Sequence, residues 1–357
     1  MEGSGDNESS NCTNYDATEF RAIAAVNSAL GGVSFFACLL VIGLIFLFKK
    51  HRFFNQRLIL YLTIAAALNT LSMLTEATVY YQQTEAFDIY CYVSAYFQQV
   101  AGWAQVLAVT CITIELLLKV FLKLQTNRLW LEIIFIIVIF VVPLLFNWIP
   151  FINNTFGKSG PWCWIRIQNE NCTGEDSIGV VLSLTLWYAT VYPLLLILSF
   201  AYVTVLISIW YQKYRYEGVF DPERQIRRNM MLSEVRPLLW YPLIFFLIEF
   251  FPLLNRLHEI ISPTNDTTFF WWLHAIVVPL EGGGIALAYA LDPETRKRLR
   301  WSIIKMYLIE CFNRRGNIDE YDFESNGMTD SLLSETKSLS TTKSYTQNAN
   351  PQYGTKV

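Results

Sequence analysis

The chain has 357 residues, of which 53% are hydrophobic and only 16% are charged. Soluble domains carry roughly 25% charged residues, so a soluble fold of this composition would lack the polar surface to cover its core. The formal net charge of −3 is too small to indicate nucleic acid as a partner. Because the hydrophobic residues stand in long blocks, the composition predicts a membrane protein.

Seven apolar runs are long enough to cross a hydrocarbon core, which takes about 20 helical residues. They predict an all-α membrane protein, a bundle of seven transmembrane helices over 23–291. The fifth run is the longest and is expected to tilt or to project into water. In chain order the predicted spans are 23–48, 58–81, 91–118, 129–152, 178–211, 237–258 and 268–291.

The Lys and Arg residues set the orientation of these spans. They gather in the segments after spans one, three and five, whereas the loops at 82–90 and 259–267 contain none. Lys and Arg are retained on the cytoplasmic side of a membrane. The N-terminus is therefore predicted outside and the C-terminus inside.

Glycosylation motifs provide an independent check on this orientation. Every N-x-Ser/Thr motif in the chain lies in a segment that the charge rule places outside. Residues 1–22 are polar and acidic, so we expect a short glycosylated extracellular N-terminus, with span one acting as an uncleaved signal-anchor. The predicted acceptors are Asn7, Asn11, Asn153, Asn171 and Asn265.

Several cysteines fall on the outer side, where disulfides persist. A bridge from Cys91, at the outer end of span three, to Cys163 would tie the 153–177 loop across the top of the bundle. Cys172 is the alternative partner for Cys91. Cys12 and Cys172 could form a second pair, since four cysteines allow three connectivities.

Two tryptophans, Trp162 and Trp164, flank Cys163 in this loop. Beside a Cys91–Cys163 bridge, their rings would pack on the sulfurs and span tops at interface depth. A plain aromatic belt would explain the rings alone, but not the cysteine between them. We therefore expect a loop pinned over a ligand pocket.

The stretches "WCWI" at 162–165 and "YPLIFFLIEFFPLLNRL" at 241–257 resemble the cyclic-AMP-receptor-like G-protein-coupled receptors. The short N-terminus and Ser/Thr-rich tail fit the same family, over roughly residues 20–310. The resemblance implies a bundle that catalyses nucleotide exchange on a heterotrimeric G protein when an extracellular ligand binds. It does not identify the ligand, because the outer half offers glutamates as well as bases to an anion such as cyclic AMP.

The chain departs from rhodopsin-like receptors in two places. Span three lacks an Asp-Arg-Tyr motif at its end, and Tyr289 precedes Asp292-Pro293 in span seven instead of following an Asn-Pro pair. The switching residues of rhodopsin-like receptors are therefore not transferred to this chain.

Glutamates within the predicted spans are candidates for function, because an ionisable group at bilayer depth is costly and usually faces protein or water. Glu281, followed by glycines 282–284, indicates a polar site in span seven, with a purely structural hydrogen bond as the alternative. Glu249 in span six is a further candidate. The pocket candidates are Glu76, Trp162, Trp164, Glu249, Arg256, His274 and Glu281.

The segment 212–236 is the longest inner loop and is rich in basic residues. It suits lipid headgroups or, given the resemblance, a docking G protein. Glu115 near the inner end of span three could pair with Arg227, Arg228 or Lys119, and an ordinary interface glutamate is the alternative. The candidate G-protein interface is Glu115, Lys119, Arg224, Arg227 and Arg228.

Residues 292–312 begin with a proline suited to the first turn of a helix and predict a short amphipathic eighth helix on the membrane. Cys311 is a palmitoylation candidate. Residues 313–357 have the composition of a disordered cytoplasmic tail, whose phosphorylation would favour a basic partner such as an arrestin. The last three residues match a ligand of a PDZ protein. The phosphorylation candidates are Ser331, Ser334, Thr336, Ser338 and Ser340.

The sequence thus predicts a multi-pass receptor of the plasma membrane that transmits an extracellular ligand signal to a heterotrimeric G protein. The alternative is a seven-span channel or transporter in which Glu76, Glu249 and Glu281 line a permeation path. A third possibility is a scaffold without signalling of its own. No enzyme activity, cofactor or metal site is expected, because no metal-ligand spacing, phosphate loop or nucleophile motif is present.

Overall fold

The computed structural model divides the chain into two units, residues 1–305 and 306–357. The first unit contains a helix bundle, and of the second unit only the end of one helix is described. The described residues are 17–74, 76, 85–122, 128–159, 161–166, 176–216, 222–261 and 268–312.

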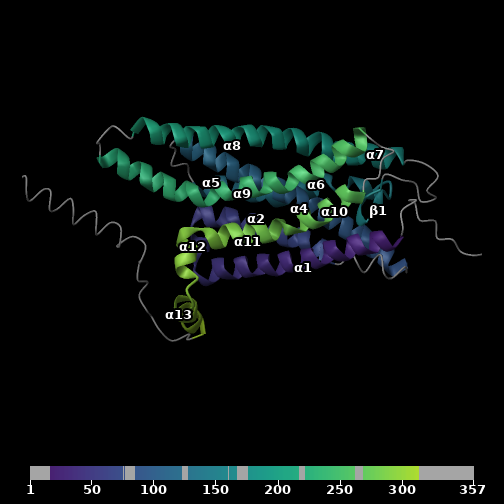
Figure 1. The fold of residues 1–357 in the computed structure, drawn as a ribbon, viewed down its shortest axis with the longest axis horizontal. Coiled ribbons are helices and arrows are strands. Elements are labelled where there is room, and N and C mark those ends of the chain that lie inside the picture. The colour runs from purple at the N-terminus through teal and green to yellow at the C-terminus, as the bar shows by residue number, and fades with distance from the viewer. Residues whose placement is uncertain are drawn as a thin grey trace, which may run out of the picture. The chain divides into compact units, whose positions relative to one another are not determined.

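Seven helical segments are long and apolar enough to cross a membrane, at the places where the sequence predicts spans. The predicted seven-helix bundle is therefore confirmed. The bundle helices lie side by side, with strand β1 at one end and helix α12 at the other (Figure 1), and we call these the hairpin end and the α12 end. The helices are α1 (Ala17–Leu47), η1 (Lys50–Arg52), α2 (Phe54–Leu74), α4 (Glu85–Leu117), η2 (Leu118–Leu122), α5 (Arg128–Ile136), η3 (Ile137–Val141), α6 (Val142–Phe146), η4 (Ile149–Phe151), α7 (Ser177–Ser183), η5 (Leu184–Tyr188), α8 (Ala189–Tyr216), α9 (Pro222–Ile261), α10 (Thr268–Val277), η6 (Val278–Leu280), α11 (Glu281–Leu291), α12 (Pro293–Arg298) and α13 (Trp301–Phe312).

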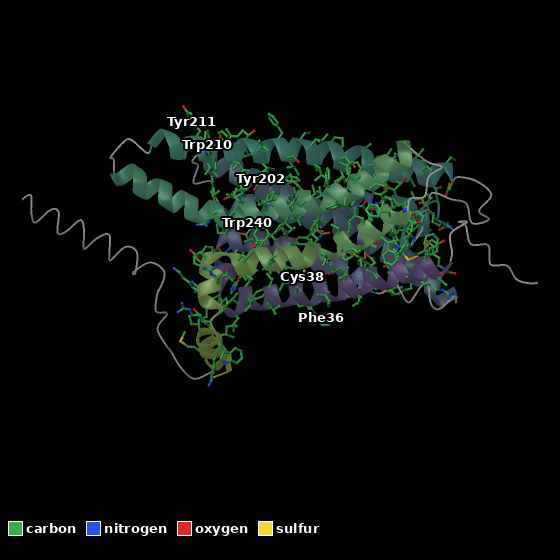
Figure 2. All side chains as sticks on the ribbon, viewed as in Figure 1. Phe36, Cys38, Tyr202, Trp210, Tyr211 and Trp240 are labelled. Carbon is green, nitrogen blue, oxygen red and sulfur yellow. A yellow bond between two sulfur atoms is a disulfide. The ribbon has the colours of Figure 1, made fainter. Side chains whose placement is uncertain are left out.

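The helices turn apolar side chains outward as well as inward (Figure 2). On α1, Phe36 is 68% exposed while Cys38 is fully buried, and on α8 Trp210 is 65% exposed while Tyr202 is buried. In water such broad apolar faces would mark aggregation or binding surfaces. In a bilayer the lipid tails cover them, because hydrocarbon is as apolar as the side chains themselves.

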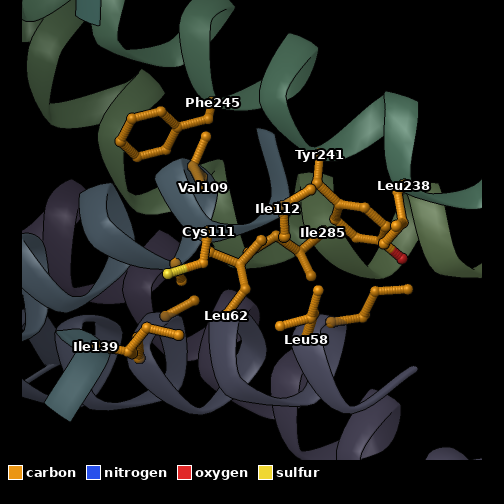
Figure 3. Close-up of a cluster of buried hydrophobic side chains, with 14 of the residues drawn as sticks. Leu58, Leu62, Val109, Cys111, Ile112, Ile139, Leu238, Tyr241, Phe245 and Ile285 are labelled. Carbon is orange, nitrogen blue, oxygen red and sulfur yellow. The ribbon is translucent and has the colours of Figure 1, made fainter. Parts of the chain in front are cut away.

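A cluster of buried apolar side chains joins α2, α4, α9 and α11 (Figure 3). Its members lie toward the α12 end of their helices, as shown by Leu58 and Leu62 near the start of α2. Close packing of this kind leaves few voids larger than a water molecule. The labelled members of this apolar layer are Leu58, Leu62, Val109, Cys111, Ile112, Ile139, Leu238, Tyr241, Phe245 and Ile285.

A short β-hairpin is the one element that the all-α prediction missed among the described residues. Strand β1 (Phe156–Ser159) pairs antiparallel with β2 (Trp162–Ile165), with Lys158 opposite Cys163. The "WCWI" stretch is therefore a strand, whose aromatic and β-branched residues suit a half-buried pleated surface.

Two segments at the α12 end differ in detail from the prediction. The segment 212–236, the longest predicted inner loop, is helical on both sides: α8 runs to Tyr216 and α9 begins at Pro222. It is rich in Arg, Glu, Gln and Met, which favour helix even outside a membrane. The eighth helix expected over 292–312 is broken between Arg298 and Trp301 into α12 and α13.

Helix α11 approaches α1 closely through a glycine. A Cβ atom at Gly282 would lie 2.8 Å from Cys38 Sγ and 3.1 Å from the carbonyl oxygen of Ser34. The backbone N–H of Gly283 donates to Ser34 Oγ at 3.2 Å. Small residues at such contacts let membrane helices approach until backbone and side chains touch.

Gly282→Ala is accordingly expected to destabilise the bundle by about 1–3 kcal/mol, because the added methyl group overpacks the α1–α11 contact. Gly43→Ala on α1 is the matched control, since a Cβ there meets nothing within 4 Å. Both variants replace a glycine in a helix by alanine, so the comparison isolates the effect of the close contact. Thermal unfolding in detergent measures the difference, and equal midpoints for the two variants would refute the close contact.

Candidate functional site: a cavity beneath the hairpin

A cavity of about 100 Å³ lies in the hairpin-end half of the bundle. Its wall combines strand β2 with helices from the beginning, middle and end of the chain, so that only the folded bundle assembles it. Along α2, α4 and α9 the members of the apolar layer stand nearer the α12 end than the cavity-lining residues do, as Leu62, Val109 and Tyr241 do. The lining residues are Asn27, Asn69, Met73, Gln98, Gln99, Gly102, Gln105, Trp162, Trp164, Trp187, Tyr188, Tyr192, Glu249, Pro252, His274 and Val278.

Aromatic rings form one side of the cavity. The Trp164 ring meets Trp187 at 6.4 Å and Tyr188 at 5.7 Å, both nearly at right angles. Trp162 stacks on His274, with ring centroids 4.5 Å apart. Edge-to-face contacts fix the rings relative to one another, because each positive edge faces a negative π surface. The wall is therefore built from mutually supported aromatic side chains.

Buried amides form another side. Trp164 Nε1 donates to Gln99 Oε1 at 2.5 Å. Two other amide atoms, Gln99 Nε2 and Asn69 Oδ1, have no hydrogen-bond partner among the described residues, although each residue is less than 10% exposed. An unsatisfied buried polar group costs about 1–3 kcal/mol. These atoms are therefore available to a polar molecule in the cavity.

The hairpin is fastened to the bundle beside the cavity. The predicted disulfide between Cys91 on α4 and Cys163 on β2 is confirmed, with Cα atoms 5.4 Å apart. Asn27 Nδ2 donates to the fully buried Glu76 at 2.7 Å. With its amide oriented so that Nε2 faces acceptors, Gln98 donates to Glu76 at 3.2 Å and to the Cys163 carbonyl at 2.8 Å. The disulfide and this polar cluster together hold the loop that carries Trp162 and Trp164.

The structure brings together four of the pocket candidates on the cavity wall: Trp162, Trp164, Glu249 and His274. Glu76 lies behind the wall in the polar cluster just described. Glu281 lies at the start of α11 and is 4% exposed, close to the Glu249 carboxyl but outside the cavity lining. The Arg256 side chain lies outside the described residues.

The amides and most of the rings of this wall were not predicted. Within the spans only ionisable groups were candidates, whereas α4 contributes three glutamines, Gln98, Gln99 and Gln105, to the cavity. The run of amide side chains in an otherwise apolar span was the available signal. There was no comparable signal for the rings of Trp187, Tyr188 and Tyr192, because aromatic residues are common in every span of this chain.

At the α12 end, Glu115 pairs with Lys119, one of its expected partners, at 3.2 Å. Lys119 Nζ also donates to Asn55 Oδ1 on α2 at 2.6 Å, so the pair links α4 to α2. Both charged side chains are largely buried. Arg224, Arg227 and Arg228 belong to α9, but their side chains lie outside the described residues.

A second buried charge cluster at this end was not predicted. Lys50 of η1, between the first two predicted spans, is 2% exposed and lies 3.8 Å from the Asp292 carboxylate. Lys50 Nζ donates to Thr295 Oγ1 at 3.0 Å, and the Thr295 hydroxyl and backbone N–H both donate to Asp292. We call Lys50, Asp292 and Thr295 the buried triad. It joins the α1–α2 connection to the α11–α12 junction.

Other predicted sites fall mostly on residues that the structure does not describe. Asn153 is exposed after η4, as a glycosylation acceptor requires. The Cys311 side chain lies outside the described residues, although α13 contains the residue. Also outside them are Asn7, Asn11, Asn171, Asn265, Cys12, Cys172, Ser331, Ser334, Thr336, Ser338 and Ser340.

No group of three or more His, Cys, Asp or Glu side chains in the described part of the chain is placed to hold a metal ion. The described wall of the cavity offers hydrogen bonds from amides, π surfaces and one carboxyl group.

Comparisons with known proteins agree with this architecture. A scan against protein-family models gives no match. Over 281 residues the chain is 23% identical to a protein of Arabidopsis thaliana named G-protein coupled receptor 1, an alignment that covers 78% of this chain and 80% of the relative. The similarity therefore extends over most of both proteins. The relative bears the name of a receptor. The seven apolar helices found among the described residues indicate a multi-pass membrane protein.

Proposed function

We propose that the chain is a plasma-membrane receptor that transmits the binding of an extracellular ligand to a heterotrimeric G protein. The observation that carries this proposal is the cavity beneath the disulfide-anchored hairpin. It is lined by polar and aromatic side chains, and the apolar layer of Figure 3 lies beneath it. A pocket closed on one side suits binding, whereas a permeation path needs a polar route through the whole bundle.

Helix α9 is the expected transmitter. It contributes Glu249 and Pro252 to the cavity and contains Pro237 and Pro242 nearer the α12 end. Prolines interrupt the hydrogen bonds of a helix and permit kinks. A ligand that fits one arrangement of α4, α9 and α10 better than another shifts the population toward that arrangement. The shift would move the α12 end of α9, which continues beyond the membrane-spanning part.

The expected docking surface includes Arg227 and Arg228 on that extension of α9. Arg227→Ala/Arg228→Ala should lower basal uptake of a GTP analogue by a panel of G proteins roughly tenfold, equivalent to about 1.4 kcal/mol. The measurement uses membranes with matched surface levels of each variant. Arg296→Ala/Lys297→Ala on α12 removes the same charge from exposed positions and is expected to have a smaller effect. Equal exchange in all three proteins would contradict docking on α9.

A further inference from the structure

We propose that the cavity takes a small organic cation that also carries a hydrogen-bond acceptor. This rests on the receptor function proposed above and names the ligand class for the same site. Three features of the described wall carry it: the sign of its charge, its aromatic rings and the direction of its unsatisfied amides.

The charge of the wall favours a cation. Among the described lining residues, Glu249 is the only one with a carboxyl group, and none is Lys or Arg. Glu249 forms no hydrogen bond or ion pair with the described residues, and it interacts electrostatically with Glu281. An anionic ligand would meet this negative charge, with His274 as the sole basic residue of the lining. A charge at this depth is costly unless paired, so a cation and Glu249 would stabilise each other.

The aromatic rings favour the same ligand. Trp164, Trp187 and Tyr188 meet edge to face, and Tyr188 stacks on Tyr192 at 5.7 Å. Rings set at right angles around one space present π surfaces from several directions. A cation within about 6 Å of such a surface gains roughly 0.5–2 kcal/mol, and rings of this kind are how proteins recognise substituted ammonium groups.

The amides define the other end of the ligand. Gln99 Nε2 is a hydrogen-bond donor on α4 without a partner among the described residues. A donor requires an acceptor, so the ligand is expected to place a hydroxyl, ether or carbonyl oxygen against Gln99. The positive group would then pair with the Glu249 carboxyl on α9.

The volume of the cavity limits the size. A cavity of about 100 Å³ is large enough for several water molecules. It therefore favours a compact ligand. A cyclic nucleotide is both larger and anionic, and is therefore a poor match to this wall.

The test measures binding without a G protein. Purified chain in nanodiscs is titrated with choline and with its uncharged carbon analogue, in which a tert-butyl group replaces the trimethylammonium group. Ethanolamine and propanol form a second matched pair. The stabilisation of thermal unfolding by each compound yields an apparent Kd. We expect at least one cation to bind about tenfold or more tightly than its neutral partner.

Glu249→Gln is expected to remove this preference and leave the neutral compounds unchanged. Asp88→Asn is the control: it removes a carboxylate that is 57% exposed near the start of α4, and should keep the preference. Trp187→Leu offers a second variant of the wall if Glu249→Gln does not fold. The proposal is overturned if neither cation is preferred, or if the folded wall variants retain the preference. Because no G protein is present, failure here leaves the nucleotide-exchange result intact, and the reverse also holds.

Discussion

Asp292→Asn is expected to destabilise the bundle by about 3–5 kcal/mol, the cost of leaving one member of a buried ion pair without its partner. Lys50 would keep its hydrogen bond to Thr295 and its place over the Tyr289 ring, 5.7 Å from the centroid, but would lose its countercharge. Asparagine has nearly the same shape and also caps helices well, so the cap on α12 is preserved. The loss therefore isolates the charge.

Lys50→Met provides the other half of a double-mutant cycle. Each single variant should be less stable than the unaltered chain. The double variant Lys50→Met/Asp292→Asn should lose less stability than the sum of the two single losses. Thr295→Val removes only a hydroxyl and is expected to cost less than either charge variant. Additive losses in the cycle would show that Lys50 and Asp292 do not interact.

Asp292→Asn is also expected to raise basal nucleotide exchange. The buried triad ties η1 to the junction of α11 and α12, so its loss frees that junction to move. A receptor whose resting arrangement is held by this contact would visit its active arrangement more often once the contact is broken.

Removal of the Cys91–Cys163 disulfide is expected to be the second large effect. The bond closes a sequence separation of 72 residues, and losing a disulfide of this kind costs about 2–5 kcal/mol. Cys91→Ala and Cys163→Ala should lower the unfolding midpoint by similar amounts, and the double variant should be no worse than either. Because β2 carries Trp162 and Trp164, the same variants should weaken any binding in the cavity.

A reducing agent offers the control for this prediction. It should lower the midpoint of the unaltered chain at least to that of the cysteine variants. Cys111→Ala, at a buried cysteine outside the disulfide, should keep the response to reductant. An unaltered chain whose midpoint reductant does not change would contradict a stabilising Cys91–Cys163 bond.

The spans and the disulfide could be predicted because each leaves a local mark on the sequence. A span needs an unbroken apolar run, and even the short α2 and α11 stand inside such runs. Cys91 and Cys163 were both placed outside by the charge rule, which left few partners. Placing the two loop tryptophans over a pocket followed from the expected disulfide, and Glu249 became a candidate because it is an ionisable group within a predicted span.

The rest depends on contacts between distant residues. Lys50 and Thr295 are separated by 245 positions, and the rule that places lysines on the inner side of a membrane gives no sign that this one is buried. Gln99 looks like an ordinary polar residue of a span until the fold brings it to the cavity wall beside Trp164. The hairpin was missed because a four-residue strand is too short for an alternating pattern to stand out.

The most direct test of the receptor function is uptake of a GTP analogue by purified G proteins, with the chain reconstituted in nanodiscs and empty nanodiscs as the blank. Both the unaltered chain and Asp292→Asn are measured, after each is shown to be folded. A receptor held at rest by the buried triad predicts uptake above the blank with at least one G protein, and faster uptake with Asp292→Asn. Uptake equal to the blank for both folded proteins, across all classes of G protein, would contradict it.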